Sequence, residues 1–501
     1  MSSTPLINVL DVSLTDLPRL LQRNNDQKPF YTDAMECMCG SGIFVSAGSA
    51  LHNTGSVGMC LIVWAACGLL SLLGALSYAE LGALINKSGG QFSYYQEAFA
   101  DLHSFWGALP SFIYSFVTIM YIRPAMVSVI VLTFAEYSIR PFSLWMSVTP
   151  KTEYILTTVV SVLALCILTF INYTSMKCFV KIQNVFTVCK VTVCFVIIVG
   201  GLYQLYLGKT ENLMTGFEGT NLSMNSLSMA FYSGLFAYDG WAASTMVSEE
   251  IKNPQINILL SILLAVPFVT VIYVMMNVSY LTVLSVPEMI AVPAVAIEFA
   301  TRALGSFTFV IPLGVAIATF GCALSTQFET SRLCYAASRE GQMLEVFSYV
   351  SVERLTPAPA VVLQGLFTLI CLLCGNVETL IDFTSFLIWI FYGITMVALL
   401  VLRHTKKDVK RTFKVPIVIP IFVLIVSVVL FLTPIIQDPK PQFLIALALI
   451  VSAFVLYVPF VYQKKRLSVV DTFTGFIIRL MDVLPPEEDK PAKDTCEKQR
   501  Y

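Results

Sequence analysis

Apolar runs of membrane-spanning length recur along this 501-residue chain and are separated by short polar turns. A helix needs about 20 predominantly apolar residues to cross the hydrocarbon core of a bilayer. Inside lipid, a helix satisfies every backbone N–H and C=O group within its own segment. The sequence therefore predicts an all-α integral membrane protein with about 12 transmembrane helices. The predicted spans are 33–52, 58–86, 104–137, 154–174, 184–207, 225–247, 257–285, 307–337, 358–376, 380–403, 415–437 and 441–463.

The composition agrees with a membrane protein and argues against several other classes. Hydrophobic residues make up 56% of the chain and charged residues 13%, which is too little polarity to cover a soluble surface. A net charge of −1 makes nucleic acid an implausible partner. The three histidines lie far apart, and no GxxxxGK[ST] nucleotide motif is present, so the sequence predicts neither an enzyme nor an ATP-driven pump. Cys371 and Cys374 have CxxC spacing but lie in an apolar run without further ligands, so no metal or cofactor is predicted.

Lysine and arginine predict how the chain is oriented. They concentrate in the loop 403–414 and in residues 464–466, which directly follow the last span. The other loops that contain several of them fall on the same side if the number of spans is even. Short loops rich in these residues stay in the cytoplasm. The sequence therefore predicts a multi-pass protein with both termini cytoplasmic. The polar tails 1–32 and 464–501 show no sign of a folded domain and flank a membrane domain at 33–463.

Two glycine-containing stretches, 40–44 and 236–241, interrupt apolar segments about half a chain apart. A broken helix is costly in lipid, because its unpaired backbone groups find no water there, and it is tolerated where those groups line a cavity. Two such interruptions at matching places in two halves of a chain are typical of a transporter's binding site. The alternative is that Gly40, Gly42 and Gly240 only permit close helix packing.

Six phrases, in this order, resemble the light subunits of heteromeric amino-acid transporters, the L-type branch of the amino acid–polyamine–organocation superfamily. The resemblance covers residues 40–465 and implies inverted five-helix repeats at about 33–207 and 225–403, with discontinuous helices 1 and 6. It also implies secondary transport by alternating access, as a sodium-independent exchange of amino acids. The phrases are Gly40-Ser41-Gly42-Ile43-Phe44-Val45-Ser46, Leu76-Ser77-Tyr78-Ala79-Glu80-Leu81-Gly82, Ile122-Arg123-Pro124-Ala125, Phe236-Ala237-Tyr238-Asp239-Gly240-Trp241, Glu249-Glu250-Ile251-Lys252-Asn253-Pro254 and Ser338-Arg339-Glu340-Gly341.

The physics of the two interruptions suits an α-amino acid, which presents a carboxylate and an ammonium at a fixed separation. Free N–H groups at the start of the second half of helix 1 suit the carboxylate. Unpaired carbonyls at the end of the first half of helix 6 suit the ammonium. The predicted substrate-binding residues are Gly40, Ser41, Gly42, Ile43, Phe236, Ala237, Asp239 and Gly240.

Three residues are predicted to control gating or selectivity. The resemblance suggests Phe236 as a lid over the substrate, although packing in the core is the simpler explanation. Arg123 lies near the middle of a predicted span, where a charge is expensive and marks a pathway or a partner. Asp239 stands beside the predicted ammonium site. The phrase Tyr-Asp-Gly-Trp that contains it resembles the corresponding phrase in exchangers of neutral and cationic amino acids and cystine. We expect Asp239 to favour cationic side chains or to pair with a basic residue such as Arg123.

Two departures from the family pattern matter. Asp33 and Glu36 place acids in the first half-helix, which keeps open the alternative of an amino-acid sensor that retains the fold without transporting. The loop predicted at 138–150 contains no cysteine, whereas relatives use one there to join a heavy subunit. The sequence therefore predicts no disulfide through this loop and leaves a non-covalent heavy-subunit glycoprotein open. Free L-amino acids and membrane lipid are the other expected partners.

Overall fold

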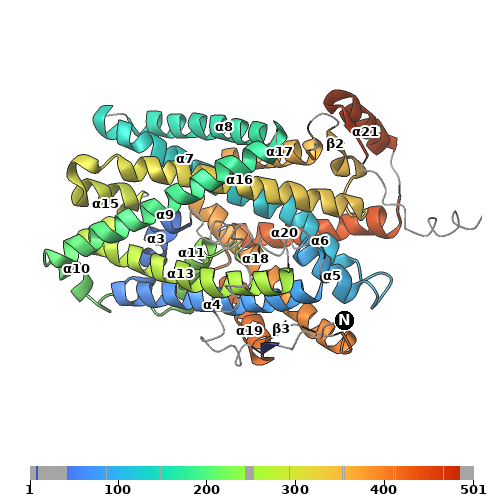
Figure 1. Cartoon of the computed structure of the whole chain (residues 1–501), viewed down its shortest axis with the longest axis horizontal. Coiled ribbons are helices and arrows are strands. Elements are labelled where there is room, and N and C mark those ends of the chain that lie inside the picture. Colours follow the sequence, from blue (N-terminus) through green and yellow to red (C-terminus); the bar gives the residue numbers. More distant parts are fainter. Residues whose placement is uncertain are drawn as a thin grey trace, which may run out of the picture.

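The computed structural model describes residues 7–8, 42–85, 87, 89–146, 149–174, 176–242, 253–292, 294–351, 354, 356–409, 411, 413–465 and 468–485. Within this part of the chain, nine helical segments are long and apolar enough to cross a membrane, and they run mainly along the long axis of the molecule (Figure 1). These segments are α4 (Val57–Leu84), α6 (Leu109–Val117) with η1 (Thr118–Ile122) and α7 (Arg123–Met146), α8 (Pro150–Thr174), α9 (Met176–Tyr206), α13 (Pro254–Val283), α16 (Val310–Arg339), α18 (Val377–Thr405), α19 (Val418–Gln437), and α20 (Pro441–Tyr457) with η5 (Val458–Tyr462).

Three shorter apolar helices complete the predicted set of spans. They are α17 (Ala358–Cys374), α3 (Gly42–Thr54) and α11 (Met224–Ala237). The helices α3 and α11 are too short to span a bilayer alone, since 13 and 14 residues rise only about 20 Å. The prediction of an all-α membrane fold is therefore confirmed for the described residues, which contain nine helical segments long enough to span and the shorter apolar helix α17.

Helices from the two halves of the chain pack in matching pairs. α3 packs against α11, α4 against α13, α7 against α16, and α8 against α17. In each pair, the helix from the first half meets the helix that holds the same place in the second half. This arrangement supports the predicted repeat division, which stays a prediction because packing alone does not establish the symmetry.

Several elements were not predicted from the sequence. A short helix, α5 (Gln91–Phe99), precedes the third span, which begins at Leu109 and not at residue 104. The loop expected at 138–150 is helical through Met146, so the true connection is much shorter. The other unpredicted helices are α10 (Glu211–Met214), α14 (Val286–Ala291), α15 (Val295–Ala303), η3 (Gly305–Phe307), η4 (Glu345–Ser348) and, in the carboxyl-terminal tail, α21 (Ser468–Met481).

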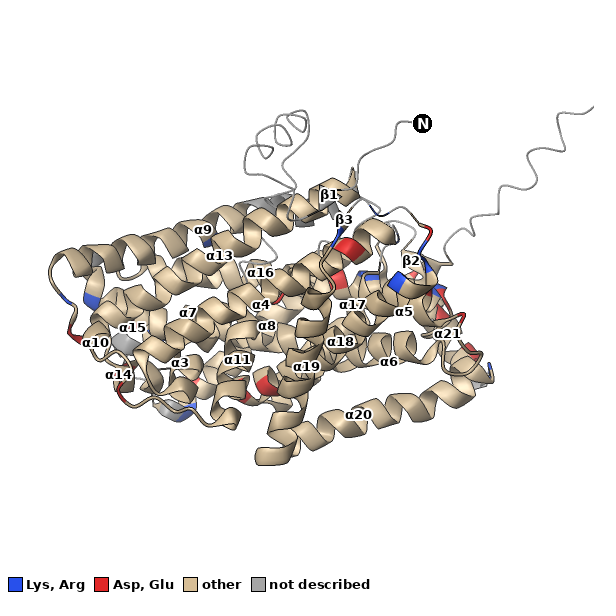
Figure 2. Cartoon of the chain, turned by 90° about the horizontal axis from the view of Figure 1, so that it is seen from below, with Lys and Arg blue, Asp and Glu red and all other residues tan. Residues whose placement is uncertain are grey.

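Both tails attach to one end of the bundle through short strands. β1 (Ile7–Asn8) pairs in parallel with β3 (Phe413–Lys414), and β2 (Val350–Ser351) pairs antiparallel with β4 (Val483–Leu484). These strands lie at the same end as α5 and α21 (Figures 1 and 2). We call this end, which carries the loop after α18 and the residues after α20, the basic end.

A buried ion cluster fixes the loop after α18 at the basic end. Glu80 on α4 is 1% exposed and accepts hydrogen bonds from Arg403 and, at 2.6 Å, from Arg411. The backbone N–H of Val415 donates to the same carboxylate at 2.9 Å, and Arg411 donates to the carbonyl of Leu402 at 2.9 Å. One carboxylate on α4 therefore holds α18 and the following loop together.

Replacing Glu80 by glutamine is expected to destabilise the fold by about 3–5 kcal/mol, because it leaves two buried guanidinium groups without their counter-ion. Thermal unfolding of the purified protein in detergent measures this loss. Glu298→Gln is the matched control, because Glu298 pairs with Arg302 at 2.8 Å on a half-exposed surface. That pair contributes at most about 1 kcal/mol. Equal melting temperatures for the two variants would contradict a structural role of the buried cluster.

Candidate functional site

The start of α3 and the end of α11 lie in direct contact at the centre of the candidate site. A Cβ atom built on Gly42 would lie 2.3 Å from the Cα of Ala237, far inside ordinary contact distance. α11 ends at Ala237, and the chain turns through Tyr238, Asp239 and Gly240. Gly240 has a φ of 123°, which a residue with a Cβ rarely adopts. Glycine is therefore needed at both positions, once for close approach and once for backbone geometry.

The end of α11 presents backbone carbonyls beside this contact. The structure describes α3 from Gly42 onward, and Ile43 and Phe44 in its first described turn are buried. At the end of α11, the carbonyl of Ala237 accepts a hydrogen bond from the Tyr273 hydroxyl at 3.1 Å. The carbonyl of Phe236 accepts the N–H of Asp239 at 3.4 Å. The last carbonyls of α11 thus lie where the two helices touch.

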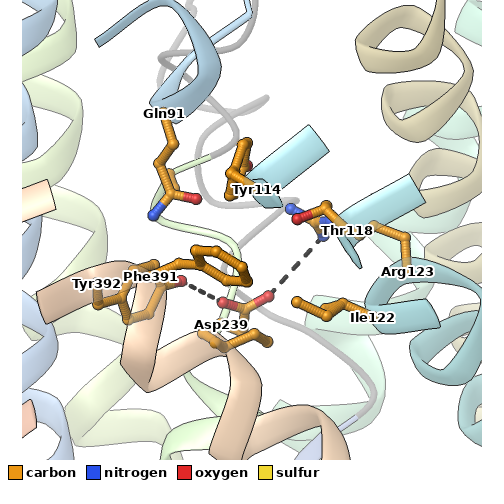
Figure 3. A pocket seen from close by; sticks show the side chains of 10 residues that line it. Gln91, Tyr114, Thr118, Ile122, Arg123, Asp239, Phe391 and Tyr392 are labelled. Atoms are coloured by element: carbon orange, nitrogen blue, oxygen red, sulfur yellow. Dashed lines mark hydrogen bonds and ion pairs between the residues drawn. The ribbon is translucent and has the colours of Figure 1, made fainter. Parts of the chain in front are cut away.

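The side chain of Asp239 projects from the turn after α11 into a charged cluster (Figure 3). Tyr392 on α18 donates a hydrogen bond to one carboxylate oxygen at 2.5 Å. A guanidinium nitrogen of Arg123 lies 3.9 Å from the other oxygen, and both side chains of this ion pair are nearly buried. The carboxylate therefore joins three elements, namely the turn after α11, α18 and α7.

The position of Arg123 depends on an unusual turn in its helix. Pro124 has no N–H group, and its ring would collide with the carbonyl of Met120 in a regular α-helix. The preceding segment η1 is a π-helix, in which the N–H of Arg123 bonds to the carbonyl of Thr118. Wider turns of this kind relieve such a conflict and are frequent at functional sites. The Arg-Pro pair therefore sets the geometry that points Arg123 toward Asp239.

A small cavity of about 20 Å³ adjoins Asp239. This volume suits about one water molecule, so an amino-acid side chain requires neighbouring residues to shift. One wall comes from α5, where Gln91 hydrogen-bonds to the hydroxyls of Tyr78 and, at 3.2 Å, of Thr395. The lining residues are Gln91, Tyr114, Thr118, Ile122, Arg123, Asp239, Ala242, Ile388, Phe391 and Tyr392.

A second, larger cavity of about 670 Å³ lies on the side away from the basic end. It runs along α3 from Phe44 to Ser49 and is also lined by α7, α8 and the segment after α14. Glu136 and Glu378 place two carboxylates on its wall. Its volume exceeds that of an amino acid, and it adjoins the same helix whose first turn meets α11.

A family model described as "Amino acid permease" matches residues 34–480. The chain belongs to the amino acid permease family. The permease is 41% identical over 454 residues to the b(0,+)-type amino acid transporter 1 of Mus musculus, covering 90% of this chain and 91% of that protein. It is 37% identical to the human cystine/glutamate transporter, with 90% and 88% covered. It is 33% identical to the large neutral amino acids transporter small subunit 2 of Mus musculus, with 91% and 86% covered. These relatives confirm the family resemblance seen in the motifs.

The predicted site residues of the permease fall into three groups. Gly42, Ala237, Asp239 and Gly240 lie together where α3 meets α11, and Arg123 pairs with Asp239 as expected. Ile43 and Phe236 are buried near them without lining either cavity described above. Gly40 and Ser41 lie outside the described residues, as do the acids Asp33 and Glu36. Their predicted roles stay predictions.

The sequence analysis of the permease missed Gln91, Tyr114, Thr118 and Tyr392. All four bring polar atoms to the cavity beside Asp239. Tyr114, Thr118 and Tyr392 lie in apolar spans, where polar side chains that face a cavity are a usable signal. Gln91 carried no such signal, because its place depends on α5 folding back against α18.

Proposed function

We propose that the permease is a secondary active exchanger that moves neutral and cationic L-amino acids, and cystine, across the plasma membrane by alternating access. The observation that carries this proposal is the contact between the amino end of α3 and the carboxyl end of α11, with an ionised pair directly beside it. The relatives named as amino acid transporters support the substrate class. Sodium independence and the plasma membrane follow from the family resemblance alone.

The two helix ends fit the two charges that every amino acid carries. The free N–H groups and the positive dipole end of α3 attract the carboxylate. The carbonyls at the end of α11 accept hydrogen bonds from the ammonium, since each carbonyl oxygen can accept two. Gly42 allows the two ends to come close enough for one small molecule to touch both. This arrangement recognises the part that all amino acids share and leaves the side chain to other residues.

Asp239 supplies the preference for a positively charged side chain. Its carboxylate is neutralised by Arg123 at 3.9 Å, a distance longer than a direct hydrogen bond. The ammonium of lysine or the guanidinium of arginine can approach the same oxygen more closely and replace this interaction. Tyr392 keeps the other oxygen in place through its hydrogen bond. A neutral side chain leaves the pair between Arg123 and Asp239 intact, so both substrate classes are accepted.

The two ends of the bundle suit alternating access. The large cavity lies along α3 from Phe44 onward, at the end opposite the basic end, which we assign to the outside because basic loops stay in the cytoplasm. At the basic end, α5 closes the path, and its Tyr95 hydroxyl donates to the carbonyl of Phe391 at 2.6 Å. We infer that the structure represents a state that is hollowed on the outer side and closed on the cytoplasmic side.

An ion pair fastens α5 in this closed position. Glu97 on α5 pairs with Lys406 after α18 and, at 3.2 Å, with Lys87. The hydrogen bond from Lys406 lowers the pKa of Glu97 below its ordinary value of 4.5. The stabilisation from this ion pair is therefore complete above the ordinary pKa and is lost only as the pH falls through the lowered value. We expect closure at the basic end to be insensitive to pH near neutrality.

Counterflow in proteoliposomes tests the proposed function. Vesicles loaded with unlabelled leucine should accumulate labelled leucine and labelled arginine without sodium or ATP, and empty vesicles should accumulate neither. Binding of labelled leucine without flux would instead support the sensor, the alternative suggested by the acids Asp33 and Glu36 in the predicted first span. A sodium requirement would refute exchange in favour of symport.

The partner proposal makes a separate prediction. Non-reducing gels of membranes that express the permease with a candidate heavy subunit should show no heavy disulfide-linked band, because the segment 138–150 contains no cysteine. Mild-detergent co-purification then detects a non-covalent complex. A band that disappears on reduction would contradict the prediction.

A further inference from the structure

The amphipathic helix α21 lies at the basic end, beside the start of α17 (Figure 1). One side of this helix packs on the protein, where it contacts α17 and η4. Ile477, Ile478 and Met481 are partly buried against the core on this side. α21 is therefore held in a defined orientation, so its other faces have a defined direction too.

A second apolar face of α21 has no covering element among the described residues. Phe473, Phe476 and Leu480 follow one another at spacings of three and four and so share one side of the helix. They are 40%, 59% and 67% exposed. In water, three large apolar side chains in one stripe would be unfavourable. We call these three residues the apolar stripe.

The surroundings of α21 identify what covers the stripe. The helix begins six residues after η5, where the last membrane span ends, so it must lie close to the bilayer surface. Leu366 and Ile370 on the neighbouring α17 are each 56% exposed, as a lipid-facing helix requires. Lys464, Lys465 and Arg479 are exposed near the two ends of α21. A helix with an apolar face and adjacent basic residues is typical of binding in the plane of an anionic membrane surface.

We propose that α21 is an interfacial helix that inserts the apolar stripe into the leaflet at the basic end, while Lys464, Lys465 and Arg479 bind anionic phospholipid headgroups. Asp471 lies on the opposite side of the helix from the stripe and faces water. Because β4 directly follows α21 and pairs with β2, lipid binding also anchors the strand pair that ties the tail to the bundle. This inference does not depend on what the protein transports.

Spin-label accessibility in the full-length protein tests the position of the stripe. A spin label introduced through an unnatural amino acid at Phe476 should collide more with oxygen, which concentrates in lipid, than with a water-soluble nickel chelate. A label at Asp471 should show the reverse, and a label at Leu366 is the lipid-facing reference. The ratio of oxygen to nickel collisions at 476 should exceed that at 471 several-fold. A ratio at 476 equal to that at 471 would place the stripe in water. Protection from both reagents would place it under protein, and either result would overturn the proposal.

The lipid class is tested in the same protein. Vesicles of phosphatidylcholine with and without phosphatidylserine provide the comparison, and the oxygen-to-nickel ratio at 476 should rise when phosphatidylserine is present. Changing Lys464, Lys465 and Arg479 together to glutamine should abolish this rise. If the rise persists in the triple variant, these three residues do not bind the headgroups, and if no rise occurs in the unaltered protein, anionic lipid is not the ligand.

Discussion

Arginine exchange should fall by about ten- to a hundredfold when Asp239 is replaced by asparagine, because a hydrogen bond to a charged group contributes roughly 1.5–3 kcal/mol. Asparagine keeps the size of the side chain and can still accept the hydrogen bond from Tyr392, so only the charge is removed. Leucine exchange should change much less, since leucine makes no ionic contact with this residue. Initial rates of counterflow for labelled arginine and labelled leucine, measured on the same proteoliposomes, give the ratio directly.

Two further variants make this result interpretable. Asp239→Asn leaves the buried Arg123 without its counter-ion and can reduce folding, so the double variant with Arg123→Gln removes both charges together. Asp382→Asn is the matched control, because the Asp382 carboxylate on α18 accepts a hydrogen bond from Gln442 at 3.3 Å and does not line the cavity beside Asp239. An unchanged arginine-to-leucine ratio in both Asp239 variants would refute the assigned role.

The second large effect is expected for Gly42→Ala, which should abolish exchange of leucine and arginine alike. The added Cβ would lie 2.3 Å from the Cα of Ala237, whereas ordinary contact begins at 3.4 Å, so α3 must move by about an ångström. Misplacement of reacting or binding groups by this amount can reduce rates about a hundredfold. The loss should affect all substrates, because both helix ends bind the part common to every amino acid.

Gly475→Ala provides the control for adding a methyl group. A Cβ on Gly475 would meet no atom within 4 Å, so exchange should be unaffected. Size-exclusion profiles of the two alanine variants separate a lost site from a lost fold. If Gly42→Ala retained normal exchange of both substrates, the close contact between α3 and α11 would not be part of the binding site.

The sequence predicted the features that have a local cause. Long apolar runs predict spans, and glycine within such a run predicts the turn at Gly240 that follows α11. A charge inside a span predicts a partner, and Arg123 indeed lies beside Asp239. In each case the penalty for exposing a polar group to lipid is large enough to be visible in one short segment.

The missed features depend on contacts between distant segments. Glu80 was visible only as part of a family phrase, because the arginines that neutralise it come more than 300 residues later. α5 was missed because its apolar residues are too few for a span, and they are buried by folding against α6 and α18. α21 was missed because it follows the last span in a polar tail. Periodicity within one segment does not reveal such partners.

The ion pair between Arg123 and Asp239 affects how much charge moves in each transport step. Both residues stay with the protein and their charges cancel, so a carrier loaded with leucine moves no net charge. A carrier loaded with arginine moves one positive charge. In a cell that is negative inside, each 100 mV then adds about 2.3 kcal/mol in favour of arginine entering in exchange for leucine. This energy corresponds to a concentration ratio of about fiftyfold, so the resting voltage favours the entry of cationic nutrients until opposing concentration gradients exceed that ratio.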